Sequence, residues 1–299
     1  MSDRASTPGG RRPLTADVDC FGVTDTGRVR KRNDDHFLVA SMHKLMRVHQ
    51  TSLPNPDAMP LISESRGFLF AVADGVGGRP GGDVASGTAL RIIAQYVTHL
   101  MDLYNRIDPD KENVFLAELQ RSVERSHHVL VSEGVRMEGG RGGATTLTLV
   151  AAVWPRAYLV QVGDSRCYRL RGDKLERMSQ DQTMAQALVE QGALTAADAE
   201  RSPLRNLLAS ALGGTEARPM ISATDIRWGD VMLICTDGLT KHVPEAEIEV
   251  ELRAIQSAQT SCRRLVDLAL ERGGTDNVTV VIARLPQRPS GAVRASLPG

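Results

Sequence analysis

The sequence predicts an α+β fold in which two mostly antiparallel β-sheets pack as a sandwich and pairs of helices cover the outside, giving four αββα layers. Short apolar or alternating runs that end in Gly or Asp recur along the chain, as β-strands do. Segments with helical spacing come in consecutive pairs, whereas a parallel βαβ fold would place one helix after each strand. The spacing therefore favours antiparallel sheets with helices outside them.

Nine runs have the pattern of strands. In chain order they are 19–25, 35–41, 67–74, 144–154, 157–164, 166–170, 221–228, 231–237 and 277–285. Helical spacing of apolar residues gives one pair of helices at 83–104 and 114–134 and a second pair at 245–255 and 262–273. A further helical region, 183–212, lies between two strands.

The domain organisation follows from composition. Residues 1–16 and 287–299 are rich in Pro, Gly, Ser and Arg and lack periodicity, so we expect two flexible tails. No linker and no internal repeat divides residues 17–286, which predicts one domain. Residues 41–66 are longer than a minimal hairpin connection, and we expect an extended β-loop there.

Charge and cysteine content exclude several classes of protein. The 36 basic and 36 acidic residues cancel, so no overall field favours nucleic acid or an anionic membrane. The four cysteines form no CxxC pair, which argues against a zinc site and suits a reducing cytosol. No apolar run reaches the roughly 18 residues of a membrane helix, and no apolar signal core opens the chain. We expect a cytoplasmic protein.

Four aspartates lie at the edges of predicted strands, namely Asp74, Asp164, Asp237 and Asp276. Carboxylates that converge on one place repel one another unless cations neutralise them. Hard oxygen ligands without a His or Cys companion select Mg²⁺ or Mn²⁺. Two such ions, about 3.5–4 Å apart, can activate water and clamp a phosphoryl oxygen.

Each aspartate also has a simpler interpretation. Asp-Gly after an apolar run is a common hairpin turn, but Asp74-Gly75 and Asp237-Gly238 are followed by helical segments instead of a second strand. Asp164 can still be a turn between strands, and Asp276 can be an ordinary strand-start residue. Both alternatives stay open on the sequence.

A local basic cluster, Arg28, Arg30, Lys31 and Arg32, precedes Asn33-Asp34-Asp35. Taken alone, such a run is usually a solvated loop. Beside a metal site, a guanidinium could hold a phosphate with two hydrogen bonds, and the following side chains add oxygen ligands.

These residues together resemble the motif series of the PPM, or type 2C, protein phosphatases of bacterial type, over roughly residues 18–285. The similar motifs, in chain order, are Arg30-Lys31-Arg32-Asn33-Asp34-Asp35, Asp74-Gly75-Val76-Gly77-Gly78, Gly143-Ala144-Thr145-Thr146, Gly163-Asp164-Ser165-Arg166, Asp237-Gly238-Leu239-Thr240 and Asp276-Asn277-Val278-Thr279. Each motif alone is weak, and six in the correct order are specific.

The resemblance implies a dinuclear Mn²⁺ or Mg²⁺ centre at one end of the sandwich. By position, Asp74 is similar to the bridging ligand, the Gly75 carbonyl to a further ligand, and Asp237 and Asp276 to the remaining ligands. Asp164, together with Asp237, is similar to the residues that hold a weaker third metal in many bacterial members.

The resemblance also implies roles around the metals. Arg30 resembles the arginine that binds substrate phosphate, Asp34 an acid that reaches one metal through water, and Asp35 an acid that orients solvent. Asn277 is expected to orient Asp276. The segment from about 174 to 216 resembles the flap that borders the active site.

Four positions differ from the family pattern or have a second interpretation. Asp34 is one methylene shorter than the Glu often found there, and Val76 occupies the place of a histidine that eukaryotic members have. Many bacterial relatives lack that histidine too. Thr145 and Thr146 can equally be β-branched strand residues.

The function implied is metal-dependent hydrolysis of phosphoserine and phosphothreonine in proteins, opposing a serine/threonine kinase, by a monomer that contacts neither nucleic acid nor membrane. One alternative is a phosphatase of a partner-switching transcription regulator, whose flap is usually reduced. Another is a pseudophosphatase that binds phosphoproteins without turnover.

Overall fold

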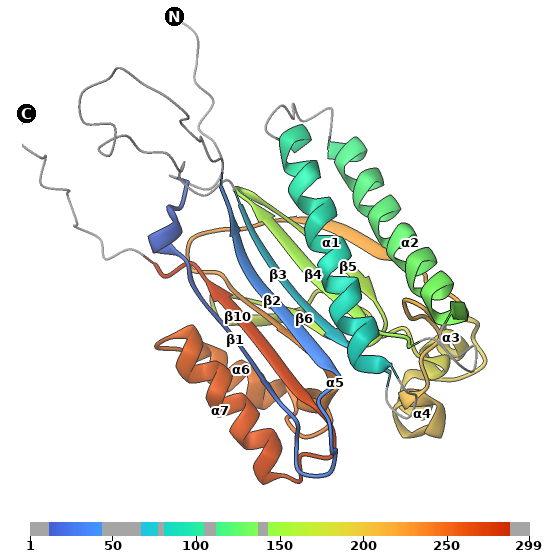
Figure 1. Ribbon diagram of the computed structural model, residues 1–299. Helices are drawn as coiled ribbons and strands as arrows, with labels where there is room; N and C mark the ends of the chain where they lie inside the picture. Colours follow the sequence, from blue (N-terminus) through green and yellow to red (C-terminus); the bar gives the residue numbers. More distant parts are fainter. Residues whose placement is uncertain (1–11, 44–66, 77–80, 105–111, 137–142, 288–299) are drawn as a thin grey trace, which may run out of the picture.

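The computed structural model describes residues 12–43, 67–76, 81–104, 112–136 and 143–287. Two five-stranded antiparallel sheets lie face to face, and helices cover both outer surfaces (Figure 1). The predicted α+β sandwich of four αββα layers is confirmed. The outer parts of both expected tails and most of the expected 41–66 loop lie outside the described residues.

The first sheet has the strand order β1-β10-β9-β6-β7 and the second has the order β2-β3-β4-β5-β8. The first sheet consists of β1 (Asp19–Asp25), β10 (Val278–Arg284), β9 (Val231–Cys235), β6 (Arg166–Arg171) and β7 (Lys174–Arg177). The second consists of β2 (Asp35–Met42), β3 (Gly67–Asp74), β4 (Leu147–Val153), β5 (Arg156–Val162) and β8 (Met220–Asp225).

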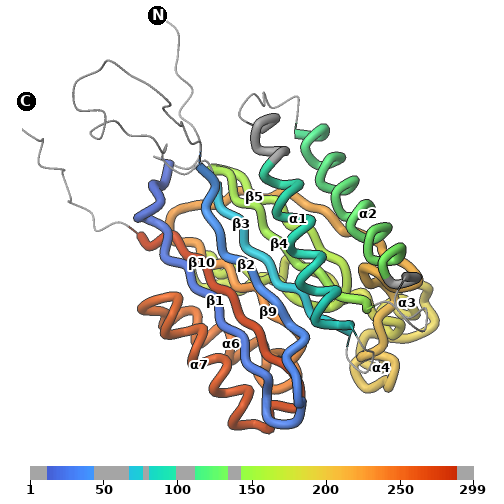
Figure 2. The backbone as a smooth tube through the Cα atoms, viewed as in Figure 1, coloured from blue at the N-terminus to red at the C-terminus, as the bar shows by residue number. Residues whose placement is uncertain are grey.

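The inner faces of the two sheets form the central core. Phe70 and Val150 from the second sheet pack in one buried cluster with Ile234 and Val281 from the first. The interior strands are apolar on both faces because each side of the sheet is covered, which explains runs such as VTVVIA in β10. Figure 2 follows the two layers of strands between the helix pairs.

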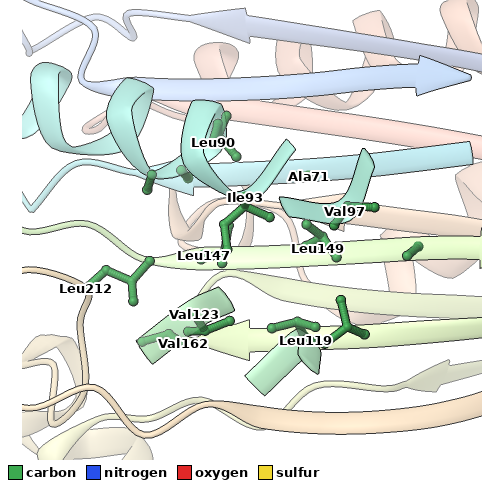
Figure 3. Packing of buried hydrophobic residues seen from close by; sticks show 14 of the residues in the cluster. Ala71, Leu90, Ile93, Val97, Leu119, Val123, Leu147, Leu149, Val162 and Leu212 are labelled. Carbon is green, nitrogen blue, oxygen red and sulfur yellow. The ribbon is translucent and has the colours of Figure 1, made fainter. Parts of the chain in front are cut away.

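Helices α1 (Gly82–Tyr104) and α2 (Glu112–Arg136) cover the second sheet. Apolar residues at helical spacing, such as Leu90, Ile93 and Val97 of α1, are buried against Leu147 and Leu149 of β4 (Figure 3). The stripe on one side of each helix thus provides the outer core of this half of the sandwich.

Helices α6 (Glu245–Arg253) and α7 (Ala258–Glu271) cover the first sheet. Helix α7 begins at Ala258, four residues before the predicted start, because the Ser257 side chain accepts a hydrogen bond from the Thr260 amide and caps the helix. The predicted boundary at 262 was wrong for that reason.

The segment from 174 to 216 has two parts. Its first four residues are strand β7, a short edge strand that pairs with β6 and that the periodicity had not indicated. The rest holds α3 (Met184–Glu190), α4 (Ala196–Arg201) and a 3₁₀ turn, η4 (Pro203–Asn206). His127 of α2 accepts a hydrogen bond from the Gly213 amide, which fixes the end of this segment.

Two further short helices complete the described chain. The 3₁₀ turn η1 spans Thr15–Asp17, and α5 spans Asp237–Thr240 directly after β9. None of the helices within the described ranges is both long and apolar enough to cross a membrane.

The core packing predicts a large loss of stability when Leu149 is shortened. This residue of β4 is 1% exposed and packs in the core beneath α1 and α2. Leu149→Ala should lower the free energy of unfolding by about 2–5 kcal/mol, because it removes buried methyl groups and leaves a cavity. Urea unfolding monitored by circular dichroism measures it. Val250→Ala, at a residue 66% exposed, is the control, and equal stability of both variants would contradict this packing.

Candidate metal centre

Acidic residues from separate parts of the chain meet at one end of the sandwich, around a cavity of about 600 Å³. Figure 1 shows α5 at this end, on the side where α3 and α4 lie. The charged residues that line the cavity are Arg30, Asp34, Asp74, Asp164, Glu216, Asp237, Lys241 and Asp276. Asp35 lies beside it, opposite Asp74 in the pairing of β2 with β3.

The end of β3 is held by two threonines. The Asp74 amide donates to the Thr146 hydroxyl (3.0 Å), and the Thr145 hydroxyl donates to the Asp74 carbonyl (2.9 Å). Gly75 follows, where an added Cβ would lie 2.5 Å from the Gly82 carbonyl oxygen. Thr145 and Thr146 therefore position the Asp74 backbone and are more than β-branched strand residues.

Asp35 is buried, and its carboxylate is held by hydroxyls of the first sheet. Thr236 and Thr279 both donate to Asp35 Oδ2, at 2.9 and 2.7 Å. This contact joins the start of β2 to the end of β9 and the start of β10, so Asp35 connects the two sheets at the end of the sandwich where the cavity lies.

Asp34 is positioned through its backbone. Its amide donates to Asn277 Oδ1 (2.9 Å), and its carbonyl accepts from the Ser86 hydroxyl (2.7 Å) and the Gly75 amide (3.1 Å). The Asn277 side chain also donates to the carbonyls of Thr26 and Arg32. Asn277 thus fixes the segment that carries Arg30 and Asp34. Its backbone amide donates to Asp276 Oδ1 (3.0 Å), so Asn277 contacts the carboxylate that it was expected to orient.

Asp237 opens α5, which packs directly against the start of β10. An added Cβ at Gly238 would lie 1.9 Å from the Asn277 carbonyl oxygen, so only glycine permits this approach. Asp164 lies in the turn that leads from β5 in one sheet to β6 in the other. It is both a turn residue and part of the cavity wall.

Two basic side chains of the cavity wall contact its acids. Arg30 contacts both oxygens of Asp276, with Nε 2.7 Å from Oδ1 and Nη2 2.9 Å from Oδ2. Lys241 Nζ lies 2.6 Å from Asp237 Oδ2 and 2.8 Å from Asp276 Oδ2. Lys241 was missed on the sequence, although its position four residues after Asp237 was a signal for a contact within one helical turn.

The pKa values of several carboxyl groups at the cavity are strongly shifted. Burial, opposed by the hydroxyls of Thr279 and Thr236, raises the pKa of Asp35 to about 7. Burial and repulsion from Asp237 raise the pKa of Asp164 to about 8. Burial and repulsion from Asp35 raise the pKa of Asp74 well above its usual value. Burial is thus the largest cause of these shifts, and repulsion between neighbouring carboxylates adds to it.

The pKa values of Asp237 and Asp276 shift in opposite directions, because Arg30 and Lys241 contact the two carboxylates unequally. Burial raises the pKa of Asp237 above its usual value, even though Lys241 opposes this shift. Burial would also raise the pKa of Asp276, but hydrogen bonds from Arg30 and Lys241 outweigh it and lower that pKa. Two basic side chains are too few to neutralise all the acids around the cavity.

The donor set fits divalent cations. Asp34 Oδ1, Asp35 Oδ1 and Asp237 Oδ1 are buried without a hydrogen-bond partner, a costly condition that bound cations would relieve. All these groups are oxygens, the ligands of Mg²⁺ and Mn²⁺. No three His, Cys, Asp or Glu side chains within the described ranges are already arranged as a complete metal-binding group.

The cavity brings together seven of the eight residues predicted for the site, and Asp35 stands directly behind it. Thr236, Thr279 and Ser86 were not predicted, because their side chains act through hydrogen bonds between distant segments and no spacing in the sequence indicates these contacts.

A model of the family described as protein phosphatase 2C matches residues 47–271. The chain belongs to the protein phosphatase 2C family. It is 36% identical over 232 residues to the serine/threonine protein phosphatase PstP of Mycobacterium tuberculosis, covering 77% of this chain and 43% of that protein. It is 30% identical over 263 residues to the serine/threonine phosphatase stp of Listeria innocua, covering 87% and 92%.

A solved structure agrees with this assignment. The crystal structure of the catalytic domain of PstP in complex with two manganese ions matches with a TM-score of 0.67 and 32% identity, over 90% of this chain and 99% of that chain. This 2C-type chain spans less than half the length of the full mycobacterial PstP protein.

The raised pKa values predict how stability depends on pH when metal is stripped. Asp35 and Asp164, with a reference pKa of 3.8, titrate near 7 and 8 in the folded protein. The folded state then binds more protons than the unfolded state, so stability is fully present below about pH 4 and is lost as pH rises through about 7–8.

Stripped protein should therefore be less stable at about pH 8.5 than at about pH 5.5, by more than about 1 kcal/mol. Urea unfolding at both pH values measures the difference, and Asp164→Asn should reduce it. Stability that rises with pH over this range, in wild type and variant alike, would be incompatible with the clustered acids.

Proposed function

We propose that this 2C-type chain hydrolyses phosphoserine and phosphothreonine esters in proteins, with two divalent ions, Mn²⁺ or Mg²⁺, held at the cavity. The observation that carries the proposal is the convergence of Asp74, Asp237 and Asp276 on one cavity with Arg30 at the same place. Its family relatives include serine/threonine phosphatases, one of them solved with two manganese ions.

Asp74, the Gly75 carbonyl, Asp237 and Asp276 are the groups that would hold the two ions. Asp164, across from Asp237, is proposed to hold a weaker third ion. Bound at such a site, two divalent cations lower the pKa of a water molecule and neutralise the charge of phosphoryl oxygens. The threonines at β3 and the glycine at α5 keep these carboxylates in place.

Arg30 is proposed to hold the substrate phosphate through its planar guanidinium. In the structure its Nη2 donates a hydrogen bond to Asp276 Oδ2, and its Nε lies 2.7 Å from Oδ1, so the guanidinium already faces a pair of anionic oxygens, as it would with a phosphate. Asp34 and Asp35 are proposed to orient water at the ions, with Asp35 fixed by Thr236 and Thr279.

The two alternatives are less well supported. The region between β7 and β8 holds α3, α4 and η4, so it is not the reduced flap expected of a partner-switching phosphatase. A pseudophosphatase should lack a core ligand, whereas Asp74, Asp237 and Asp276 are all present at the cavity. The relatives compared here are named as phosphatases.

The cellular location and the partners of the protein are also proposals. All four cysteines are unpaired, and three of them are buried, which suits a reducing cytosol. Phosphorylated proteins are the proposed substrates, with a serine/threonine kinase acting in the opposite direction. A monomeric state and the domain limits 17–286 stay predictions from the sequence.

Loss of one carboxylate should abolish turnover. Asp74→Asn or Asp237→Asn should lower kcat on a phosphothreonine peptide by about 100-fold or more, because each removes a proposed ligand charge. Phosphate release with Mn²⁺ present measures it, and circular dichroism checks the fold. Asp173→Asn, at an exposed residue, is the control for loss of one negative charge.

Metal removal tests the same chemistry without a mutation. Dialysis against excess chelator should remove activity, and Mn²⁺ should restore it. Full activity of the wild type in excess chelator would exclude the proposed mechanism.

A further inference from the structure

Lys241 is a basic residue of the cavity whose charge the proposed chemistry does not use. We propose that Lys241 is an internal cation that competes with divalent ions for Asp237 and Asp276, and so sets the affinity of this site for metal. The inference rests on the proposed function, since it concerns the same carboxylates, but it can fail independently.

The contacts define the competition. Lys241 Nζ lies within 2.6 Å of Asp237 Oδ2 and 2.8 Å of Asp276 Oδ2, so one ammonium group bridges two proposed metal ligands. A divalent ion on the same oxygens would lie within a few ångströms of Nζ, where two positive charges repel. The ion and the ammonium group therefore disfavour each other on these oxygens.

The surroundings of Lys241 keep it charged and attracted to the site. Burial lowers the pKa of Lys241, but Asp237 and Asp276 outweigh burial and raise that pKa above its usual value. Asp164 is also close enough for Lys241 to lower its pKa in opposition to burial. Lys241 thus neutralises part of a cluster of acids that would otherwise repel one another.

Displacement is sterically possible. Lys241 forms part of the wall of two cavities, the metal cavity of about 600 Å³ and a neighbouring one of about 700 Å³ bounded by α3 and α4. Asp164, Asn206 and Asp237 border both cavities as well. The four-carbon side chain of Lys241 can therefore leave the carboxylates without displacing the backbone of α5.

The competition predicts two effects of opposite sign for Lys241→Met. Removal of the ammonium group leaves the acids of the cavity unneutralised, so the metal-stripped variant should be less stable than stripped wild type. The same change removes the competitor, so the variant should bind Mn²⁺ more tightly, by about tenfold or more. A residue that serves only to stabilise the fold would not tighten metal binding.

Calorimetric titration of stripped protein with Mn²⁺ measures the affinity, and thermal unfolding with and without Mn²⁺ measures the stability. Lys174→Met is the matched control, because Lys174 is exposed on β7 and the substitution changes the net charge equally. Both readouts are independent of phosphatase activity. Circular dichroism of the loaded variant verifies its fold.

Tighter Mn²⁺ binding by Lys241→Met, with lower stability only in the stripped state, would support the proposal. Equal affinity of wild type and Lys241→Met would overturn it while leaving the metal-dependent phosphatase intact. Absence of Mn²⁺ binding by every variant would overturn both.

A measurement on the wild type avoids the mutation altogether. An amine-reactive ester followed by mass spectrometry should label Lys241 slowly in stripped protein and faster once Mn²⁺ is added, while labelling of Lys174 stays constant. Unchanged labelling of Lys241 on Mn²⁺ binding would contradict its displacement.

Discussion

Repulsion between carboxylates is the constraint around which this end of the sandwich is organised. The β2–β3 register places Asp35 opposite Asp74, and the ends of β5, β9 and the start of β10 add Asp164, Asp237 and Asp276 around the same cavity. Burial makes their charge more costly, and Arg30 and Lys241 offset only part of it. Divalent cations are the partners that such an arrangement of oxygen ligands favours.

The sandwich makes this repulsion tolerable because the backbone around each acid is fixed elsewhere. Thr145 and Thr146 hold the end of β3, and Asn277 fixes the segment before β2. Thr236 and Thr279 connect Asp35 of one sheet to the ends of strands in the other. The cost of bringing the acids together is thereby offset by hydrogen bonds around the proposed ligands and by the core between the sheets.

Much of this could be predicted from the sequence. Apolar runs that end in Asp gave the strands, and the paired helical segments gave the layers. Asp74-Gly75 and Asp237-Gly238 stood out because helices follow them. The glycines have a physical reason in the structure, since a side chain at Gly75 or Gly238 would collide with a neighbouring backbone carbonyl.

Most features that the sequence did not predict depend on contacts that form only in the folded chain. Strand β7 is only four residues long and pairs at an edge, so its periodicity is too weak to detect. The early start of α7 depends on the Ser257 cap. The side-chain hydrogen bonds of Asn277 could not be inferred, because their partners lie 243–251 residues away in sequence. Lys241 follows a recognised motif, but its contact with Asp276 exists only in the fold.

The most direct test of the account is anomalous diffraction at the manganese edge from crystals of this protein soaked in Mn²⁺. The account predicts two strong peaks, about 3.5–4 Å apart, enclosed by Asp74, Asp237 and Asp276. Peaks only at other places, with these three carboxylates turned away from one another, would contradict it.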